Sequence, residues 1–209
     1  MKGDIHIHSK YSPDSISEPE KIMITAKHMG LDFIAISDHN KFRLYSGDII
    51  VLPAEEVSSL DGHILALFID GEIQKGLSQA ETVEAIHDKN GIAICAHPYR
   101  KVNGIGSKFL NIYDAIEVKN GRCMASCNSR SELLSRNTNK PRTAGSDAHF
   151  YEEIGRVFME AEATDQESLR KAILVGNVKI FGEDLSLQGQ FELYMKLGKE
   201  YVLRGFKRI

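Results

Sequence analysis

The sequence predicts one α/β domain whose strands alternate with helices and close into a small, distorted barrel. Short apolar segments alternate with segments that carry helix-capping residues, which is typical of a mostly parallel sheet with crossover helices. An open doubly wound sheet would also explain this alternation. However, candidate metal ligands follow nearly every predicted strand from residue 6 to residue 149, and only a closed ring brings so many strand ends to one mouth. At 209 residues a complete eight-fold barrel is at the short limit, so a missing unit or shortened helices are expected.

The first predicted strand, Asp4 to His8, carries two histidines separated by one isoleucine. Successive side chains of a strand point to opposite faces, so His6 and His8 project together from one face. Two imidazoles side by side at a strand end indicate a metal site.

The later elements are predicted from apolar runs, capping residues and closing glycines. Strands are expected at residues 33–37, 49–52, 63–69, 92–95, 114–118, 142–144, 157–159 and 178–181. Helices are expected at residues 17–30, 78–91, 126–136 and 166–175, and the first two begin with capping-box sequences at Ser17 and Ser78. The tail from residue 185 has apolar residues at helical spacing, so we expect a closing helix packed on the barrel rather than a partner-binding helix.

Composition limits the classes of function. The net charge of −3 and the pI near 6.2 provide no basic field of the kind that usually accompanies strong nucleic-acid binding. No apolar run approaches the roughly 20 residues of a membrane span. The N-terminus leads directly into the ligand-bearing strand and leaves no room for a signal peptide, so we expect a cytoplasmic protein. Three cysteines without export signals indicate reduced thiols, and the spacing of Cys123 and Cys127 is only a weak zinc signal.

Six of the eight histidines lie at ends of predicted strands beside other ligand-type residues. These are His6, His8, His39, His63, His97 and His149. The remaining two, His28 and His87, fall in the last turn of predicted helices, where a partly cationic side chain suits the helix end. Carboxylates that could balance several cations are Asp14, Glu55 or Glu56, and Asp147. Imidazole and carboxylate ligands suit zinc, manganese or iron, and bridged ions of this kind favour hydrolysis.

The motifs around these residues occur in a fixed order. They are His6-x-His8 with Tyr11-Ser12-Pro13-Asp14, Ser37-Asp38-His39, Glu56-Val57-Ser58, Gly62-His63-Ile64-Leu65, Ala96-His97-Pro98, Glu117-Val118-x-Asn120-Gly121 and Gly145-Ser146-Asp147-Ala148-His149. This ordered set resembles the PHP family, named for polymerase and histidinol phosphatase. The resemblance covers residues 4 to 149 and is specific because the motifs occur together. We expect one domain over residues 1–209, with the barrel at about 1–183 and a C-terminal extension at about 184–209.

The resemblance implies a distorted seven-stranded β/α barrel, similar to a TIM barrel, that holds two or three divalent ions. Carried over to this chain, it implies that His6, His8, Glu56 and Asp147 hold one metal, that Glu56 bridges to a second held by His63 and His97, and that Asp14, His39 and His149 hold a third. Glu56 is preferred to Glu55 because it precedes Val57-Ser58. Glu117 is expected to be structural or to support a ligand, and Asp38 is a candidate to orient a ligand imidazole.

Cations near the mouth are expected to bind a substrate phosphate. Arg100 and Lys101 follow the His97 motif, and Arg122 follows Asn120-Gly121. A guanidinium binds a terminal phosphate as a fork, whereas lysine contributes a mobile point charge. His149 and Asp147 are the predicted catalytic residues, and His149 or another site histidine is expected to assist proton transfer.

The predicted function is a metal-dependent phosphoesterase that hydrolyses a small phosphorylated substrate through a metal-activated hydroxide. One alternative is an oligonucleotide-end nuclease or nucleotide phosphodiesterase, which the neutral-to-acidic charge balance disfavours. A second alternative is a non-catalytic domain that keeps metal for stability or binding, which the complete ligand set disfavours. We expect no stable nucleic-acid complex and no membrane partner. The sequence leaves the leaving group, the metal identity and the oligomeric state open.

Overall fold

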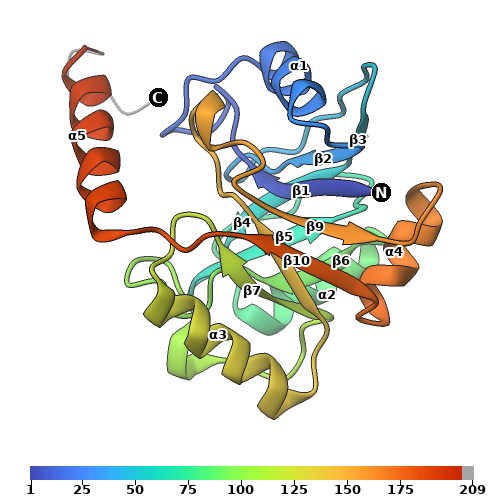
Figure 1. Ribbon diagram of the computed structural model, residues 1–209. Coiled ribbons are helices and arrows are strands. Elements are labelled where there is room, and N and C mark those ends of the chain that lie inside the picture. The colour runs from blue at the N-terminus through green and yellow to red at the C-terminus, as the bar shows by residue number, and fades with distance from the viewer. Residues whose placement is uncertain (204–209) are drawn as a thin grey trace.

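The protein has a mixed α/β fold built from two five-stranded sheets and five α-helices within residues 1–203 (Figure 1). The computed structural model describes these residues apart from the side chain of residue 201. The strands are β1 (Lys2–Ile7), β2 (Phe33–Ile36), β3 (Ile50–Leu52), β4 (Ala54–Ser58), β5 (His63–Leu67), β6 (Ile92–Cys95), β7 (Ala115–Asn120), β8 (Arg142–Gly145), β9 (Val157–Ala161) and β10 (Val178–Gly182). The helices are α1 (Pro19–His28), α2 (Gln79–Asp88), α3 (Ala125–Thr138), α4 (Gln166–Leu174) and α5 (Leu187–Leu203).

The predicted closed barrel of seven strands is not confirmed. One sheet has the order β10-β9-β1-β2-β3 and the other the order β4-β5-β6-β7-β8. Within the described residues, the two sheets are joined by isolated bridges, Ile7 to Ala148 and His39 to Glu56, rather than by continuous ladders. The first bridge joins the end of β1 to the segment after β8, and the second joins the segment after β2 to the middle of β4.

The sheets are also less parallel than expected. β1, β2 and β3 are parallel, as are β6, β7 and β8, but β4 pairs antiparallel with β5, and β9 pairs antiparallel with β1 and β10. β4 is not predicted from the sequence because its two glutamates interrupt the apolar pattern. A short turn over residues 59–62 joins β4 to β5, which allows the two strands to pair antiparallel.

A shared apolar core fills the space between the two sheets. Ile5 and Phe33 from the first sheet pack in one cluster with Leu65 and Ile94 from the second. Each of these four side chains is fully buried. Helices α1 and α3 lie on opposite sides of the sheets in Figure 1. The strand ends are therefore held by a packed interior and do not line an open pore.

The two predicted capping boxes have different outcomes. At α2, the Ser78 hydroxyl accepts a hydrogen bond from the Glu81 backbone N–H at 3.3 Å, and the Glu81 carboxylate accepts from Ser78 N–H at 2.9 Å, as predicted. At α1, Glu18 occupies the N-cap position and makes no side-chain cap. The predicted cap Ser17 is buried and donates to the backbone carbonyl of His149 at 3.0 Å. The Ser17 hydroxyl therefore fixes the segment after β8 instead of the helix start.

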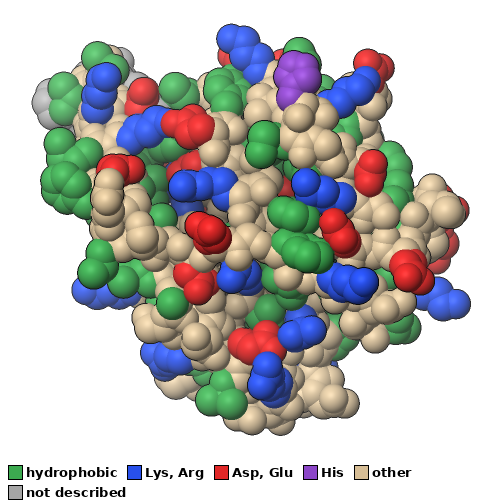
Figure 2. Space-filling view, in the orientation of Figure 1, with side chains coloured by type: hydrophobic (Ala, Val, Ile, Leu, Met, Phe, Trp, Pro, Cys, Tyr) green, Lys and Arg blue, Asp and Glu red, His purple; other side chains and the backbone are tan. Residues whose placement is uncertain are grey.

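The predicted C-terminal helix is present as α5, and it stands apart from the sheets in Figure 1. Its large apolar side chains are exposed rather than packed: Leu187 is 73% exposed, Phe191 66% and Tyr194 65%. Figure 2 shows hydrophobic side chains along this edge of the molecule. The helix contacts the segment after β8 through Lys196, which pairs with Glu152. The expected packing of an apolar face on the barrel is therefore wrong for these side chains.

Within residues 1–203, none of the helices has the length and apolar character needed to cross a lipid bilayer.

Candidate metal centre

The candidate site lies where the ends of β1 and β8 pass each other. β1 carries His6 and leads into His8, and β8 ends at Gly145, just before Asp147. A Cβ on Gly145 would lie 2.4 Å from the Cβ of His6, so only glycine lets the two strands approach this closely. Asp147 and His149 consequently lie beside the two histidines of β1.

Glu56 lies at the centre of the site and is 1% exposed. Its Oε1 lies 3.4 Å from His6 Nε2, 2.9 Å from His63 Nδ1 and 2.9 Å from His97 Nε2, and its Oε2 lies 3.3 Å from His8 Nε2 and 2.9 Å from His39 Nδ1. One carboxylate thus contacts five imidazoles, which is the geometry needed to bridge two ions.

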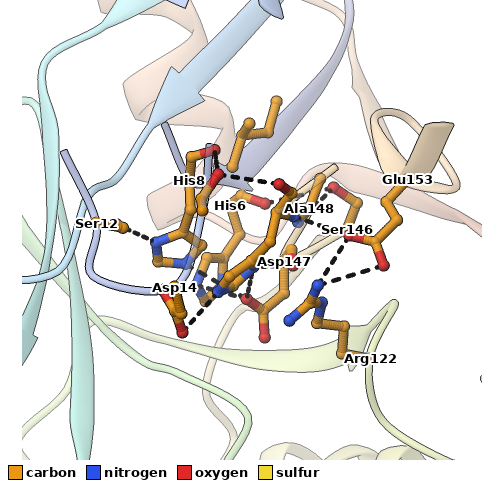
Figure 3. Close-up of polar contacts among 12 residues, drawn as sticks. His6, His8, Ser12, Asp14, Arg122, Ser146, Asp147, Ala148 and Glu153 are labelled. Carbon is orange, nitrogen blue, oxygen red and sulfur yellow. Dashed lines mark hydrogen bonds and ion pairs between the residues drawn. The ribbon is translucent and has the colours of Figure 1, made fainter. Parts of the chain in front are cut away.

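Two further carboxylates complete the cluster (Figure 3). Asp147 Oδ1 lies 3.3 Å from His8 Nε2 and 3.6 Å from His149 Nδ1. Asp14 Oδ2 lies 3.0 Å from His149 Nε2 and 3.6 Å from His39 Nε2. The structure therefore brings all nine residues predicted as ligands into one connected cluster.

The donor set fits divalent ions. Four overlapping groups have ligand atoms within 4.8 Å of one another: His8, Asp14, His39 and His149; His6, His97 and Asp147; His6, His8 and Glu56; and His39, Glu56 and His63. Several of the donor atoms, among them His6 Nε2, His8 Nε2 and Glu56 Oε2, are buried without a hydrogen-bond partner in the described part of the chain. Buried polar atoms are normally satisfied, so such a set of converging acceptors indicates a bound cation.

The grouping differs in part from the one that the family resemblance implied. His8 joins Asp14, His39 and His149, and His39 also groups with Glu56. Ligands shared between neighbouring groups are expected when the ions of a cluster lie close together. Within residues 1–203, no candidate metal group contains a cysteine, so the weak zinc signal of Cys123 and Cys127 has no support.

Backbone conformation is strained at two of these residues. His97 has a φ of 27° and Asp147 a φ of 55°, in the left-handed region that residues other than glycine rarely adopt. Such strain persists only where the surrounding structure enforces it, and it occurs frequently at functional sites.

Glu117 orients two of the histidines. Its Oε1 lies 2.8 Å from His6 Nδ1, and its Oε2 accepts the backbone N–H of His97 at 2.8 Å. A carboxylate at Nδ1 favours the tautomer with the proton there, so the Nε2 lone pair of His6 faces the cluster. Glu117 therefore lies where the sequence analysis expected a supporting residue.

Asp38 supports His8 through Ser12, a residue to which the sequence alone assigns no role. Ser12 Oγ lies 2.9 Å from His8 Nδ1, accepts the backbone N–H of His39 at 3.0 Å and donates to Asp38 Oδ1 at 2.9 Å. The hydroxyl thus uses its one donor and both acceptor positions. Ser12 holds His8 in the tautomer whose Nε2 faces the cluster, and it also fixes the start of the His39 segment.

The electrostatics of the cluster are strongly coupled. Burial alone would lower the pKa of His39, but Glu56 and Asp14 raise it to about 10. Burial would raise the pKa of Glu56, but the surrounding histidines hold it well below its ordinary value. The carboxylates therefore stay ionised and create a field that attracts positive charge, as a cation site requires.

Comparison with known proteins identifies the family. Residues 4–94 match the model described as the PHP domain, and residues 126–178 match the model described as PHP-associated. The chain belongs to the PHP family. Uncharacterized protein MJ1587 of Methanocaldococcus jannaschii is 34% identical over 142 residues, covering 57% of this chain and 82% of the relative.

Two solved structures share this PHP fold at low sequence identity. A two-domain protein from Bacteroides vulgatus, described as containing a predicted PHP-like metal-dependent phosphoesterase, has a TM-score of 0.70 and 16% identity, covering 94% of this chain and 69% of that chain. The lesion-specific endonuclease of Pyrococcus furiosus has a TM-score of 0.69 and 20% identity, covering 88% of this chain and 60% of that chain. These two structures show that the chain shares its fold with a PHP-like protein and with an endonuclease.

The three cations predicted to bind substrate occupy different positions in this PHP site. Arg100 Nη1 lies 2.7 Å from Asp147 Oδ2, and its side chain is 32% exposed beside the cluster. Lys101 is exposed on the following loop. Arg122 is 8% exposed and donates to both carboxylate oxygens of Glu153 at 3.3 and 3.0 Å (Figure 3). Arg100 thus lies partly exposed beside the cluster, whereas Arg122 points to a protein carboxylate.

Arg122 instead supports the segment that carries His149. Its partner Glu153 accepts the backbone N–H groups of His149 at 2.8 Å and of Phe150 at 3.1 Å. The guanidinium therefore balances a buried carboxylate that fixes the backbone of a candidate ligand.

Proposed function

We propose that this PHP protein hydrolyses the phosphate ester bond of a small phosphorylated substrate with the help of two or three divalent ions. The observation that carries the proposal is the convergence of nine imidazole and carboxylate side chains, with Glu56 at the centre; several of the donor atoms in this set are buried and unpartnered among the described residues. Zinc, manganese and iron all accept nitrogen and oxygen ligands of this kind. Lys and Arg are interspersed with Asp and Glu on the face shown in Figure 2, which is in keeping with a small substrate.

For the ligands of the ions we keep the assignment that the family resemblance implies. We assign His6, His8, Glu56 and Asp147 to one ion, Glu56, His63 and His97 to a second, and Asp14, His39 and His149 to a third. Ions held there would polarise a phosphoryl oxygen and lower the pKa of water so that it attacks phosphorus at neutral pH.

The chain's own residues bind and orient the phosphate. Arg100 has further N–H groups besides the one that it donates to Asp147. We propose that these groups bind a phosphate oxygen and stabilise the negative charge that develops in the transition state. Lys101 adds a mobile positive charge on the same loop.

His149 is the proposed proton donor to the leaving group. Its Nδ1 lies 2.9 Å from the backbone carbonyl of Asp147, so Nδ1 donates and only Nε2 remains available. That Nε2 faces Asp14 at 3.0 Å. One nitrogen cannot both bind a metal and carry a proton. His149 would therefore transfer a proton only when the third ion is absent, and Asp14 would then orient its imidazole.

The experiment that tests the proposal measures phosphate release by metal-free protein reconstituted with manganese, zinc or iron. The substrates are small phosphomonoesters, together with phosphodiesters and a short oligonucleotide, because one structural neighbour is an endonuclease. We expect turnover with at least one metal. A His8→Ala variant should lose turnover and bound metal but keep its circular dichroism, whereas exposed His28→Ala should retain all three.

A fully metal-loaded protein that hydrolyses none of these esters would refute the proposal. A His8→Ala variant that unfolds would favour the alternative of a structural metal. In that case His149→Ala, which removes a residue at the edge of the cluster, provides the second measurement: turnover must fall while the metal bound by His6, His8 and Glu56 is kept.

A further inference from the structure

A polar groove opens beside the metal centre, between the turn that joins β4 to β5 and the loop that follows β6. Its volume is about 390 Å³, and its walls include Ser58, Leu60, Asp61, His63 and Asn103. We call it the rim groove. Its size lies within the range of about 300 to 1,000 Å³ that is usual for small-molecule sites.

The rim groove begins at a candidate metal ligand. The His63 side chain forms part of its wall and is 9% exposed, while its Nδ1 lies 2.9 Å from Glu56 Oε1. One imidazole therefore separates the groove from the centre of the cluster. A phosphate bound at the cluster would have its ester substituent within reach of this groove.

The walls of the rim groove are held backbone to backbone. The His63 N–H donates to the Asn103 carbonyl at 2.9 Å. Gly62 has a φ of 154°, and a Cβ there would lie 2.8 Å from that same carbonyl oxygen. A Cβ on Gly104 would lie 2.4 Å from the Arg100 carbonyl oxygen. A side chain at Gly62 would push the turn away from the loop, and one at Gly104 would collide with the backbone of the loop itself, so both glycines are needed for the walls to pack as they do.

The chemistry of the walls excludes several kinds of substituent. Among the described residues that line the groove, the His63 imidazole is the one aromatic ring, and its Nδ1 faces Glu56, so a nucleobase finds no Phe, Tyr or Trp ring to stack on. None of these lining residues is lysine or arginine, so a second phosphate finds no cation in the wall. The one carboxylate, Asp61, already pairs with Lys108 at 3.0 Å, which offsets its attraction for an amine.

What remains is a set of neutral hydrogen-bonding groups. Ser58 Oγ accepts from the Asn40 amide at 3.0 Å, which leaves its own hydroxyl hydrogen free to donate. The exposed Asn103 side chain hydrogen-bonds to no other residue within the described part of the chain, and its amide offers both a donor and an acceptor. We infer that the rim groove binds the leaving group of the substrate and that this leaving group is a polyol or a sugar. This inference rests on the proposed phosphomonoesterase function.

The test compares two phosphomonoesters that differ only in their hydroxyl groups, ribitol 5-phosphate and pentyl phosphate. Manganese-loaded and zinc-loaded protein is assayed for kcat and KM with both, and with AMP and phosphoethanolamine. A site that hydrogen-bonds substrate hydroxyls discriminates strongly against an analogue that lacks them. We expect kcat/KM for ribitol 5-phosphate to exceed that for pentyl phosphate by at least about tenfold.

Asn103→Gly isolates the groove, because glycine accepts the φ of 63° at this position and only the amide is lost. We expect a fall of about tenfold in kcat/KM for ribitol 5-phosphate, mainly through KM, and a change of less than about twofold for pentyl phosphate. Asn139→Gly is the matched control, since Asn139 is also exposed, has a φ of 52° and lies outside the groove. It should leave both substrates unaffected.

The remaining outcomes would overturn either the inference about the leaving group or the proposed function itself. Turnover without a preference for hydroxyls, or an equal loss on both substrates in Asn103→Gly, overturns the inference and leaves the proposed function in place. A preference for phosphoethanolamine that disappears in Asp61→Asn would assign the groove to an amine, and a preference for AMP would assign it to a nucleoside; both overturn the inference. Failure to hydrolyse any of these esters overturns the proposed monoesterase function and the inference with it.

Discussion

Two adjacent acids on β4, Glu55 and Glu56, point to opposite faces of the strand, and we predict that only Glu56 binds metal. Glu56 enters the metal cluster, whereas Glu55 is fully buried on the other side. Glu55 Oε2 accepts the backbone N–H of Ile73 at 3.1 Å, and its Oε1 has no hydrogen-bond partner among the described residues. Burial raises the pKa of Glu55 from its ordinary value of 4.5 to about 7. The perturbation that we choose is Glu55→Gln, which keeps the acceptor for Ile73 and removes the titration.

The raised pKa of Glu55 determines how its contribution to the free energy of unfolding changes with pH. Between pH 4.5 and about 7 the folded protein binds more protons at Glu55 than the unfolded chain does. The contribution of Glu55 to stability is therefore fully present below pH 4.5 and is lost as the pH rises through about 7. The total loss is about 3 kcal/mol, of which about 2.5 kcal/mol falls between pH 5 and pH 8.

The assay is urea unfolding of metal-free protein at pH 5 and at pH 8, followed by circular dichroism. Removing metal matters because metal binding is itself pH-dependent. The wild-type protein should lose about 2.5 kcal/mol more of its free energy of unfolding over this interval than Glu55→Gln does, equivalent to about 5 to 10 °C in Tm. Glu84→Gln, which removes an exposed acid on α2, is the control and should follow the wild type. Parallel losses in the wild type and Glu55→Gln would refute the reasoning.

Glu56→Gln is the matched partner of this experiment. It removes the charge of the carboxylate that contacts five histidines, so we expect most of the bound metal to be lost. Glu55→Gln should retain the wild-type metal content by elemental analysis. Loss of metal in both variants would show that the two acids are not separated as the structure places them.

Three other predictions concern the support of the site. Ser12→Ala removes the hydroxyl that holds His8 Nδ1, so metal affinity measured by calorimetric titration should fall about 10- to 100-fold. The exposed Ser129→Ala is the control, and equal metal affinities in the two variants would contradict this prediction. Arg122→Ala leaves Glu153 buried without its counter-charge, so the free energy of unfolding should fall by about 3 to 5 kcal/mol, and a loss below about 1 kcal/mol would argue against the pair. Adding zinc or manganese at about 1,000 times its Kd should raise the free energy of unfolding by about 4 kcal/mol, and a Tm that does not respond to metal or chelator would rule out a bound ion.

The candidate ligands could be predicted from the sequence because the relevant signal is local. The histidines sit at the end of a short apolar segment or in the turn that follows, and the His6 and His8 pair faces one side by strand geometry alone. Glu56 is different: it lies in the middle of β4, and the family motif rather than a strand end distinguished it from Glu55. Ser12 could not be assigned in this way. Its hydroxyl partners are His8, four residues away, and Asp38, 26 residues away, and only the fold decides which polar groups a hydroxyl meets.

The closed barrel, which is not confirmed, was inferred from ligand positions that do not require it. Convergence of the ligands requires only that the strand ends meet, and two isolated bridges achieve this without a continuous ladder. The exposed apolar side chains of α5 have a similar explanation. Helical spacing of Phe191 and Tyr194 predicts a helix, but it carries no information about which surface covers them.

Arg100 and Arg122 show why a basic residue near a site cannot be assigned to substrate from its position alone. Both follow a strand that carries site residues, so the sequence treats them alike. In the fold, Glu153 lies 31 residues beyond Arg122 and occupies its guanidinium in a buried pair. Arg100 meets Asp147, a candidate metal ligand whose negative charge bound ions would partly neutralise, and its side chain stays partly open. The difference lies in the partner carboxylate. Glu153 holds the backbone of His149 and Phe150, whereas Asp147 would share its charge with bound ions, and in the function that we propose this would leave the Arg100 guanidinium available to a phosphate.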